Sequence, residues 1–304
     1  MKLTDPADGK EYKIKNITYE NKTAGVKCGI CEDENRNEFF IKITDYGRFR
    51  EVNKEKNILN IAEEEARTLK IISKCSLRVP VLYSSWNDRA AHYFVIIMKK
   101  MPGISMRLWM KRHPAENLDA KDIFVRTQLI LQICTVMRDI NRQYPALVHR
   151  DLKPENIFIS LDKEFRWKIW IIDFGCANLN YVRNVGTVGY QAPEQTGMRG
   201  CTVNITPRTD IFAIGQIYYE LLTGNVPLIG KNYKFRSGND NWSVFPELPY
   251  EILRIPGTDK INNLLKRMTA FRAEDRIIYD RLIAELKRIK TGKAENGQEN
   301  KRTF

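Results

Sequence analysis

The stretch that decides the fold is His-Arg-Asp-Leu-Lys-Pro-Glu-Asn, at residues 149–156. An amphipathic helical pattern precedes it at residues 122–143, and short apolar runs at 157–159 and 168–172 follow it and predict a hairpin. Residues 149–156 are therefore expected to form a loop held between rigid elements. Such loops often carry the functional residues of a protein, because the scaffold around them fixes their side chains.

The polar side chains of this region suggest a cation site beside a proton acceptor. Asn156 offers an amide oxygen, and Asp173, which follows the next predicted strand, offers a carboxylate oxygen. Mg²⁺ prefers oxygen ligands of this kind and keeps some of its own waters. Asp151 is placed to orient a hydroxyl nucleophile and accept its proton, and Lys153 is placed to reach a phosphate.

The chain before residue 99 has the patterns of a β-rich unit with one helix. Polar turns separate the predicted strands, which lie at residues 12–19, 25–30, 38–43, 79–86 and 93–98. Residues 52–74 have helical periodicity, with one stripe formed by Ile61, Glu65, Leu69 and Ile72. The turn-forming run Met-Pro-Gly at 101–103 then interrupts the pattern.

The chain beyond this break is mostly helical. The predicted helices lie at residues 122–143, 210–223, 258–270 and 278–289, and the second is expected to end at Gly224. The predicted fold class is therefore α+β, with a small antiparallel β-rich lobe at about 12–98, a hinge at about 99–103 and a larger, mostly helical lobe at about 104–290. The polar tail at 291–304 is expected to be disordered.

Composition excludes several classes of protein. The 304 residues are 43% hydrophobic and 29% charged, which is typical of a globular protein and not of a collagenous or wholly disordered chain. No apolar run approaches the roughly 18 residues of a membrane helix, and the first residues lack the apolar stretch of a secretory signal. We therefore expect a soluble, cytoplasmic protein without membrane insertion. Cys28 and Cys31 have zinc-ligand spacing, but no second pair follows them, so reduced structural cysteines are expected.

Several short motifs occur in a particular order along the chain. In sequence order they are Lys42 after Ile41, Glu65 with Leu69 four residues later, His-Arg-Asp at 149–151 with Asn156, Asp-Phe-Gly at 173–175, Ala-Pro-Glu at 192–194, Asp210 with Gly215, and Arg276. Any one of them could arise by chance, but the ordered set resembles the eukaryotic-type protein kinase family over about residues 12–290. The resemblance implies a bilobal protein-kinase-like fold.

The same resemblance implies a role for each catalytic-site residue. Lys42 would bind the α- and β-phosphates of ATP and be held by Glu65. Asn156 and Asp173 would bind Mg²⁺. Asp151 would be the catalytic base, and Lys153 would contact the transferred phosphate. The implied catalytic residues are therefore Asp151, Lys153, Lys42 and Glu65. Glu63 and Glu64 compete with Glu65, but each residue turns a helix by about 100°, and only Glu65 shares the inward stripe.

The resemblance also indicates how adenine would be bound and which hydroxyl would be phosphorylated. Met98 would lie at the back of the adenine pocket, and the backbone from Lys99 to Met101 would contact adenine. Lys153, together with Thr187 before the Ala-Pro-Glu motif, is similar to the serine/threonine branch of the family. We expect the Thr187 hydroxyl to bond near Asp151 and Lys153. Glu194 of the Ala-Pro-Glu motif and Arg276, near the end of the large lobe, are expected to form a buried ion pair.

The clearest departure from the family is the loop that the pattern G-x-G-x-x-G-x-V forms over the phosphates. Aligning Val26 on the valine, as a residue contacting the nucleotide, places Tyr19, Asn21 and Ala24 at the three glycines. Side chains there limit the approach of backbone amides to phosphates. A pseudokinase that serves as a binding or scaffold module therefore stays open as an alternative to a serine/threonine protein kinase. A small-molecule kinase also stays open, because it would share the metal-binding and base residues.

The net charge of +13 is unevenly distributed. Residues 1–98 contain 17 Lys and Arg against 15 Asp and Glu, whereas residues 99–304 contain 33 against 22. The excess lies in the lobe expected to receive a protein substrate. We therefore favour acidic or already phosphorylated protein partners over nucleic acid. No feature of the sequence indicates an oligomeric state.

Overall fold

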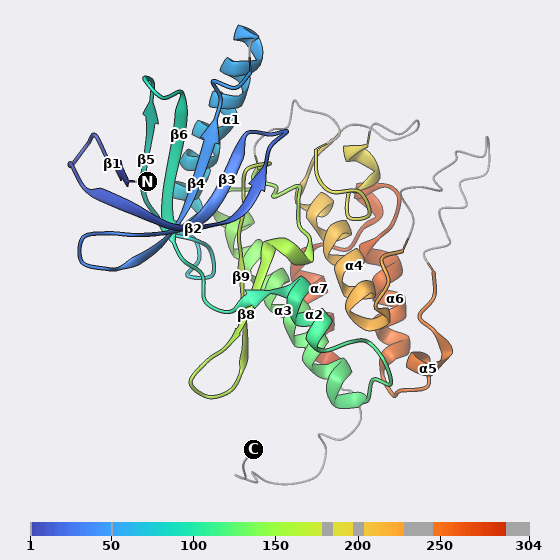
Figure 1. The fold of residues 1–304 in the computed structure, drawn as a ribbon. Helices are drawn as coiled ribbons and strands as arrows, with labels where there is room; N and C mark the ends of the chain where they lie inside the picture. Colours follow the sequence, from blue (N-terminus) through green and yellow to red (C-terminus); the bar gives the residue numbers. More distant parts are fainter. Residues whose placement is uncertain (1, 50, 178–184, 197–203, 228–245, 290–304) are drawn as a thin grey trace.

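The computed structural model describes residues 2–49, 51–177, 185–196, 204–227 and 246–289. Figure 1 shows two lobes, a twisted sheet with one helix and a larger unit dominated by helices. The predicted α+β architecture with two lobes is confirmed. The tail at 291–304, expected to be disordered, lies outside the described residues.

The small lobe is built on one antiparallel sheet of six strands in the order β1-β2-β3-β4-β6-β5. The strands are β1 (Lys2–Thr4), β2 (Glu11–Asn21), β3 (Val26–Glu32), β4 (Glu38–Asp45), β5 (Leu82–Asp88) and β6 (Tyr93–Lys99). Successive side chains of a strand point to opposite faces. Ile41 and Ile43 of β4 therefore enter a core cluster with Tyr12 and Trp86, while Lys42 between them points to the other face.

Helix α1 (Val52–Ile72) packs on the face of the sheet to which Lys42 points, since Lys42 bonds to Glu65 of this helix. Leu69 and Ile72 of this helix share a core cluster with Ile96, which lies opposite Lys42 across β4 and β6. Glu65 falls on the same stripe and is 4% exposed. The helix therefore buries a carboxylate next to a lysine, as its predicted stripe requires.

The large lobe contains the other elements of the described chain. They are β7 (Ile104–Ser105), α2 (Met106–Arg112), α3 (Ala120–Gln143), β8 (Ile157–Leu161), β9 (Trp167–Ile171), α4 (Pro207–Thr223), α5 (Tyr250–Leu253), α6 (Thr258–Met268) and α7 (Tyr279–Arg288), with short 3-10 turns η1 (Pro154–Asn156), η2 (Pro193–Gln195) and η3 (Ala273–Asp275). Among the described residues, no helix has the length and apolar character needed to span a bilayer.

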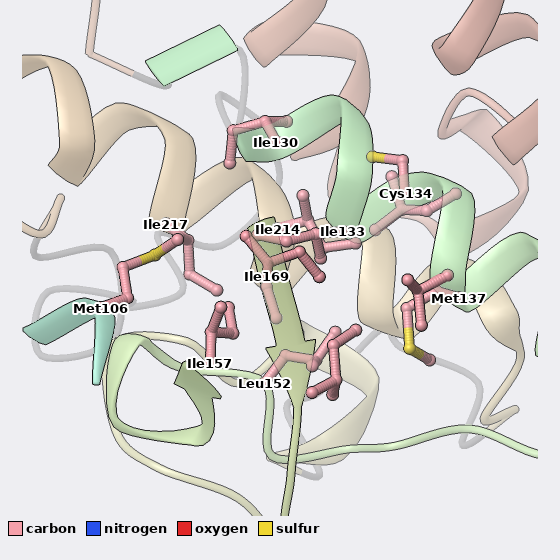
Figure 2. Packing of buried hydrophobic residues seen from close by; sticks show 14 of the residues in the cluster. Met106, Ile130, Ile133, Cys134, Met137, Leu152, Ile157, Ile169, Ile214 and Ile217 are labelled. Atoms are coloured by element: carbon pink, nitrogen blue, oxygen red, sulfur yellow. The ribbon is translucent and has the colours of Figure 1, made fainter. Parts of the chain in front are cut away.

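The core of this lobe lies between α3, α4 and the β8–β9 hairpin. Figure 2 shows side chains from these elements packed together, among them Ile133 and Met137 of α3, Ile169 of β9 and Ile214 of α4. The predicted stripe of α3 is confirmed, because Leu129, Ile133, Met137 and Ile140 are all fully buried. A capping box between Asp119 and Asp122 starts this helix.

Helix α4 is surrounded by protein on every side. Its residues from Thr209 to Leu222 are all buried. Thr206 caps its first turn, and Gly224 ends it in the left-handed conformation, with φ of 75°. Because the helix is so buried, any charged group on it must have partners. Asp210 and Glu220 are such groups, and both prove important for the site.

Short elements are the ones that the sequence patterns did not predict. Strands β1 and β7 and helices α2 and α5 span two to seven residues each. Such lengths are too short to show a clear period of hydrophobic residues. They form because tertiary contacts stabilise them, as when β1 pairs with β2 through Leu3 and Tyr12.

Candidate active site

Lys42 lies between two carboxylates from different parts of the chain. Its Nζ donates to Oε1 of Glu65 at 2.8 Å and to Oδ1 of Asp173 at 3.2 Å. Glu63 and Glu64 instead contact Arg67 on the outer side of α1. The predicted contact of Lys42 with Glu65, and not with its two neighbours, is therefore present.

The charges of these three groups depend on one another. Burial alone lowers the pKa of Lys42, but Asp173 and Glu65 more than offset this and raise the pKa well above its ordinary value. Lys42 in turn lowers the pKa of Asp173. The lysine is thus held positive and Asp173 is held negative, which suits them to phosphate and cation binding respectively.

The loop at 149–156 is anchored to the buried helix α4. The carboxylate of Asp210, 1% exposed, accepts hydrogen bonds from the backbone N–H groups of His149 at 2.8 Å and Arg150 at 2.9 Å. The ring of His149 packs against Phe174, with the ring centroids 4.5 Å apart. Arg150 has a positive φ of 68°, so this anchoring stabilises a backbone conformation that is costly for a non-glycine residue.

Asp151, Lys153 and Thr187 form a closed hydrogen-bonded group. Lys153 Nζ lies 2.7 Å from Oδ2 of Asp151 and 2.7 Å from Oγ1 of Thr187. The Thr187 hydroxyl donates to Oδ1 of Asp151 at 2.7 Å. The expected contacts of Thr187 are therefore confirmed. The Asp151 carboxylate is held in one orientation, beside a cation that can meet a phosphate.

Asp173 begins a segment that turns sharply toward the core. Its φ is 62°, and the next residue, Phe174, is fully buried. A Cβ atom on Gly175 would lie 3.1 Å from Oε2 of Glu65, so the chain passes closer to α1 than most side chains would permit. This packing places the Asp173 carboxylate beside Lys42 while Phe174 anchors the turn.

The oxygen donors of Asn156 and Asp173 fit a hard cation. Nδ2 of Asn156 donates to the backbone carbonyl of Asp151 at 2.9 Å, which leaves the amide oxygen as the group to offer a metal. Across the described part of the chain, no cluster of three or more His, Cys, Asp or Glu side chains is suited to a metal. A cation here would complete its shell with water and phosphate oxygens, which is how Mg²⁺ is usually held.

The register of β3 with β4 shows which side chains lie over this region. Cys28 pairs with Lys42, Ile30 with Phe40, and Val26 with Thr44. The hinge end of the sheet is at Lys99, the last residue of β6, which pairs with Phe39. Moving away from the hinge along this face, the order is therefore Ile30, Cys28 and Val26.

This order corrects the expected position of Val26. The family resemblance implies adenine at the hinge and phosphates at Lys42, so a residue that covers adenine is expected to lie between the two. Ile30 meets this condition, whereas Val26 lies beyond Lys42 at the outer end of the strand. Residues 23–30 also have the G-x-G-x-x-G-x-V spacing, with Gly25 at the second glycine and Cys28 at the third.

The sequence alone did not lead us to Ile30 and Cys28 as the residues of β3 on the Lys42 face, although the spacing of residues 23–30 was available as a signal. Gly25 is also a required glycine. Its φ is 69°, and a Cβ atom there would lie 2.5 Å from the backbone oxygen of Asp45. The turn between β2 and β3 therefore retains one of the family's three glycines.

The hinge residues lie at the junction of the two lobes. Met98 is 6% exposed and pairs with Phe40, so it lies at the hinge end of the face that carries Lys42. The backbone N–H of Lys99 donates to the carbonyl of Val81 at 2.8 Å, which fixes the strand where it leaves the sheet. Met101 is buried at 8% exposure.

The ion pair between Glu194 and Arg276 is confirmed. The guanidinium meets the carboxylate through two bonds of 2.6 and 2.8 Å, and both residues are at most 3% exposed. Thr209 of α4 donates a third hydrogen bond to Glu194. This network joins η2 to the helical core and lies apart from the groups around Lys42.

Fold and site together define a phosphotransferase of two lobes, with a lysine–glutamate pair in one lobe and a loop of Asp, Lys and Asn in the other. The family model for the protein kinase domain matches residues 24–285. The chain belongs to the protein kinase family.

Its relatives include proteins from bacteria and from an animal. It is 36% identical over 140 residues to serine/threonine-protein kinase Pkn1 of Myxococcus xanthus, covering 43% of this chain and 18% of that protein. It is 38% identical over 92 residues to PknL of Mycobacterium tuberculosis, covering 28% and 21%. It is 26% identical over 264 residues to Nek2 of Mus musculus, covering 81% and 54%. The matches with the two bacterial proteins thus span about a fifth of their length.

Proposed function

We propose that this chain is an ATP- and Mg²⁺-dependent serine/threonine protein kinase that transfers the γ-phosphate to a protein hydroxyl, with Asp151 as catalytic base. The observation that carries the proposal is the hydrogen-bonded group of Asp151, Lys153 and Thr187. It presents a carboxylate and a cation together, where an incoming hydroxyl and a phosphate can meet. The names of the similar proteins agree with this assignment.

The residues divide the work of the reaction. Asp151 accepts the proton as the substrate oxygen attacks the γ-phosphorus and the bond to the β-phosphate oxygen breaks. Lys153 donates to oxygens of the transferred group, and Lys42, held by Glu65, binds the α- and β-phosphates. Mg²⁺ on Asn156 and Asp173 would neutralise charge on the phosphates. Met98, Lys99, Met101 and Ile30 would surround adenine.

The pseudokinase alternative has one observation in its favour. Thr23 and Cys28 occupy positions where the family pattern has glycines, and side chains there hinder contact between backbone amides and phosphates. Against it, Lys42, Asp151, Asn156 and Asp173 are all present, and the contacts of Lys42 with Glu65 and Asp173 are formed. We therefore favour an active enzyme. The cytoplasmic location and acidic or phosphorylated partners stay predictions.

The test is to incubate the protein with Mg²⁺, labelled ATP and a generic acceptor protein, alongside Asp151→Asn. We expect label on serine or threonine, reduced about 10²- to 10⁴-fold in the variant. Asp280→Asn is a matched control, because Asp280 is an exposed residue paired with Arg142 on the surface. Nucleotide binding without transfer would support the pseudokinase, and label only on a metabolite would support a small-molecule kinase.

A further inference from the structure

Arg107, the second residue of α2, joins two carboxylates and a tyrosine from three distant segments. Its Nε donates to Oε1 of Glu155 at 2.7 Å, and its Nη2 donates to the hydroxyl of Tyr190 at 2.6 Å. Its Nη1 contacts Oε1 of Glu220 on α4, and the Tyr190 hydroxyl donates to the other oxygen of Glu220 at 2.6 Å. We call these four residues the Arg107 network.

The Arg107 network adjoins the group around Asp151. Glu155 belongs to η1, two residues after Lys153. The backbone N–H of Tyr190 donates to the carbonyl of Thr187 at 3.0 Å. The segments that position Asp151, Lys153 and Thr187 therefore also position the Arg107 network. When the acceptor hydroxyl of a substrate lies at Asp151, the substrate residues beside the acceptor lie within reach of this network.

The charges of the network define a cation site. Two carboxylates converge on a single guanidinium. Glu220 is 3% exposed, so it requires a positive partner, whereas the side chain of Glu155 is 46% exposed and faces solvent. Without Arg107, the two carboxylates would form an open acidic pocket that an arginine or lysine of another chain could fill.

Given the proposed function, we infer that Arg107 is a specificity-determining residue that fills this cation site from within the chain. A substrate that offers arginine or lysine beside its acceptor hydroxyl gains no ion pair here, because both carboxylates already have their cation. The kinase therefore does not select basic acceptor segments through Glu155 and Glu220. This agrees with the excess of positive charge in the large lobe.

The test compares the wild type with Arg107→Gln, which removes the charge but retains an amide that can donate to Glu220. Arg107→Lys, which keeps the charge, is the matched control. The substrates are serine peptides in which one arginine is moved through the positions around the acceptor. We expect Arg107→Gln to gain about tenfold or more in kcat/KM from arginine at one position, a gain absent from the wild type and from Arg107→Lys. The gain should disappear in Arg107→Gln combined with Glu155→Gln.

Several results would overturn the inference. One is a folded Arg107→Gln variant with the position dependence of the wild type, since a purely structural role for Arg107 predicts no new preference. Another, independent of how that variant folds, is a tenfold preference for arginine in the wild type that Glu155→Gln abolishes.

A wild type that labels no acceptor at all would instead count against the proposed function. In that event, the cation site is tested by thermal unfolding in millimolar methylguanidinium. A raised melting temperature for Arg107→Gln but not for the wild type would support the site, and equal responses would overturn it.

Discussion

Cys28 lies directly opposite Lys42 in the antiparallel pairing of β3 with β4. Residues paired in this way point to the same face of a sheet. The thiol is therefore close to the charges of the site, and its pKa is raised to about 11 by burial, which Lys42 partly opposes. Cys28 is thus expected to stay a neutral thiol, and its side chain adds bulk where the family pattern has a glycine.

The same register predicts which substitution weakens ATP binding. Ile30→Ala should raise the Kd for ATP about five- to tenfold, because it removes the apolar side chain expected to cover adenine, between the hinge and Lys42. Val26→Ala should change the Kd less than about twofold, because Val26 lies beyond Lys42. Calorimetric titration with nucleotide checks both, and a larger effect at Val26 than at Ile30 would show that the register argument is wrong.

Thr187 offers a test of how the Asp151 carboxylate is oriented. Thr187→Val keeps the shape of the side chain but removes the hydroxyl that contacts both Asp151 and Lys153. We expect kcat to fall about ten- to hundredfold, since misplaced catalytic groups are costly. Thr187→Ser retains a hydroxyl and should stay within a few-fold of the wild type. Equal activity of the two variants in a steady-state assay would contradict this role.

The buried pair of Glu194 and Arg276 should affect stability. Glu194→Gln leaves a buried guanidinium without its anion, and we expect the free energy of unfolding to fall by about 3–5 kcal/mol. The control is Glu285→Gln, which breaks an exposed pair with Arg267 and should cost less than about 1 kcal/mol. Urea unfolding measures both values. Similar losses for the two variants would indicate that burial of the first pair has no special effect.

Asp162, at the turn between β8 and β9, predicts a local pH dependence. Backbone hydrogen bonds, chiefly from Arg166, lower its pKa to about 2 although burial opposes them. Because the pKa is lowered by folding, the ionised carboxyl stabilises the folded turn fully at pH values above the unfolded pKa of about 3.9. This stabilisation is lost as the pH falls through the folded pKa. Carboxyl resonances in NMR should show the low pKa, and Asp162→Asn should abolish this titration. A titration midpoint of Asp162 near 4 would show that the hydrogen bonds from the backbone do not hold its carboxylate.

Much of the fold could be predicted because its signals are local. The stripes of α1 and α3 repeat every three or four residues. All four members of the α3 stripe are buried, as are Glu65, Leu69 and Ile72 of α1, whereas Ile61 is only partly buried. The choice of Glu65 over Glu63 and Glu64 followed from the same helical geometry. The identities and order of Lys42, Asp151, Asn156 and Asp173 also required only the sequence, because the motifs are short and contiguous.

The sequence by itself determined the two-lobed class and the groups gathered around Asp151. Only the tertiary structure decided the register that puts Ile30, and not Val26, between the hinge and Lys42, because sliding a strand by an even number of residues keeps the same side chains on each face. It alone also brought Arg107 to Glu220, which is 113 residues away. No periodic pattern of the sequence links these two residues. The buried carboxylate of Glu220 requires a positive partner, and the fold supplies it from a distant segment of the chain.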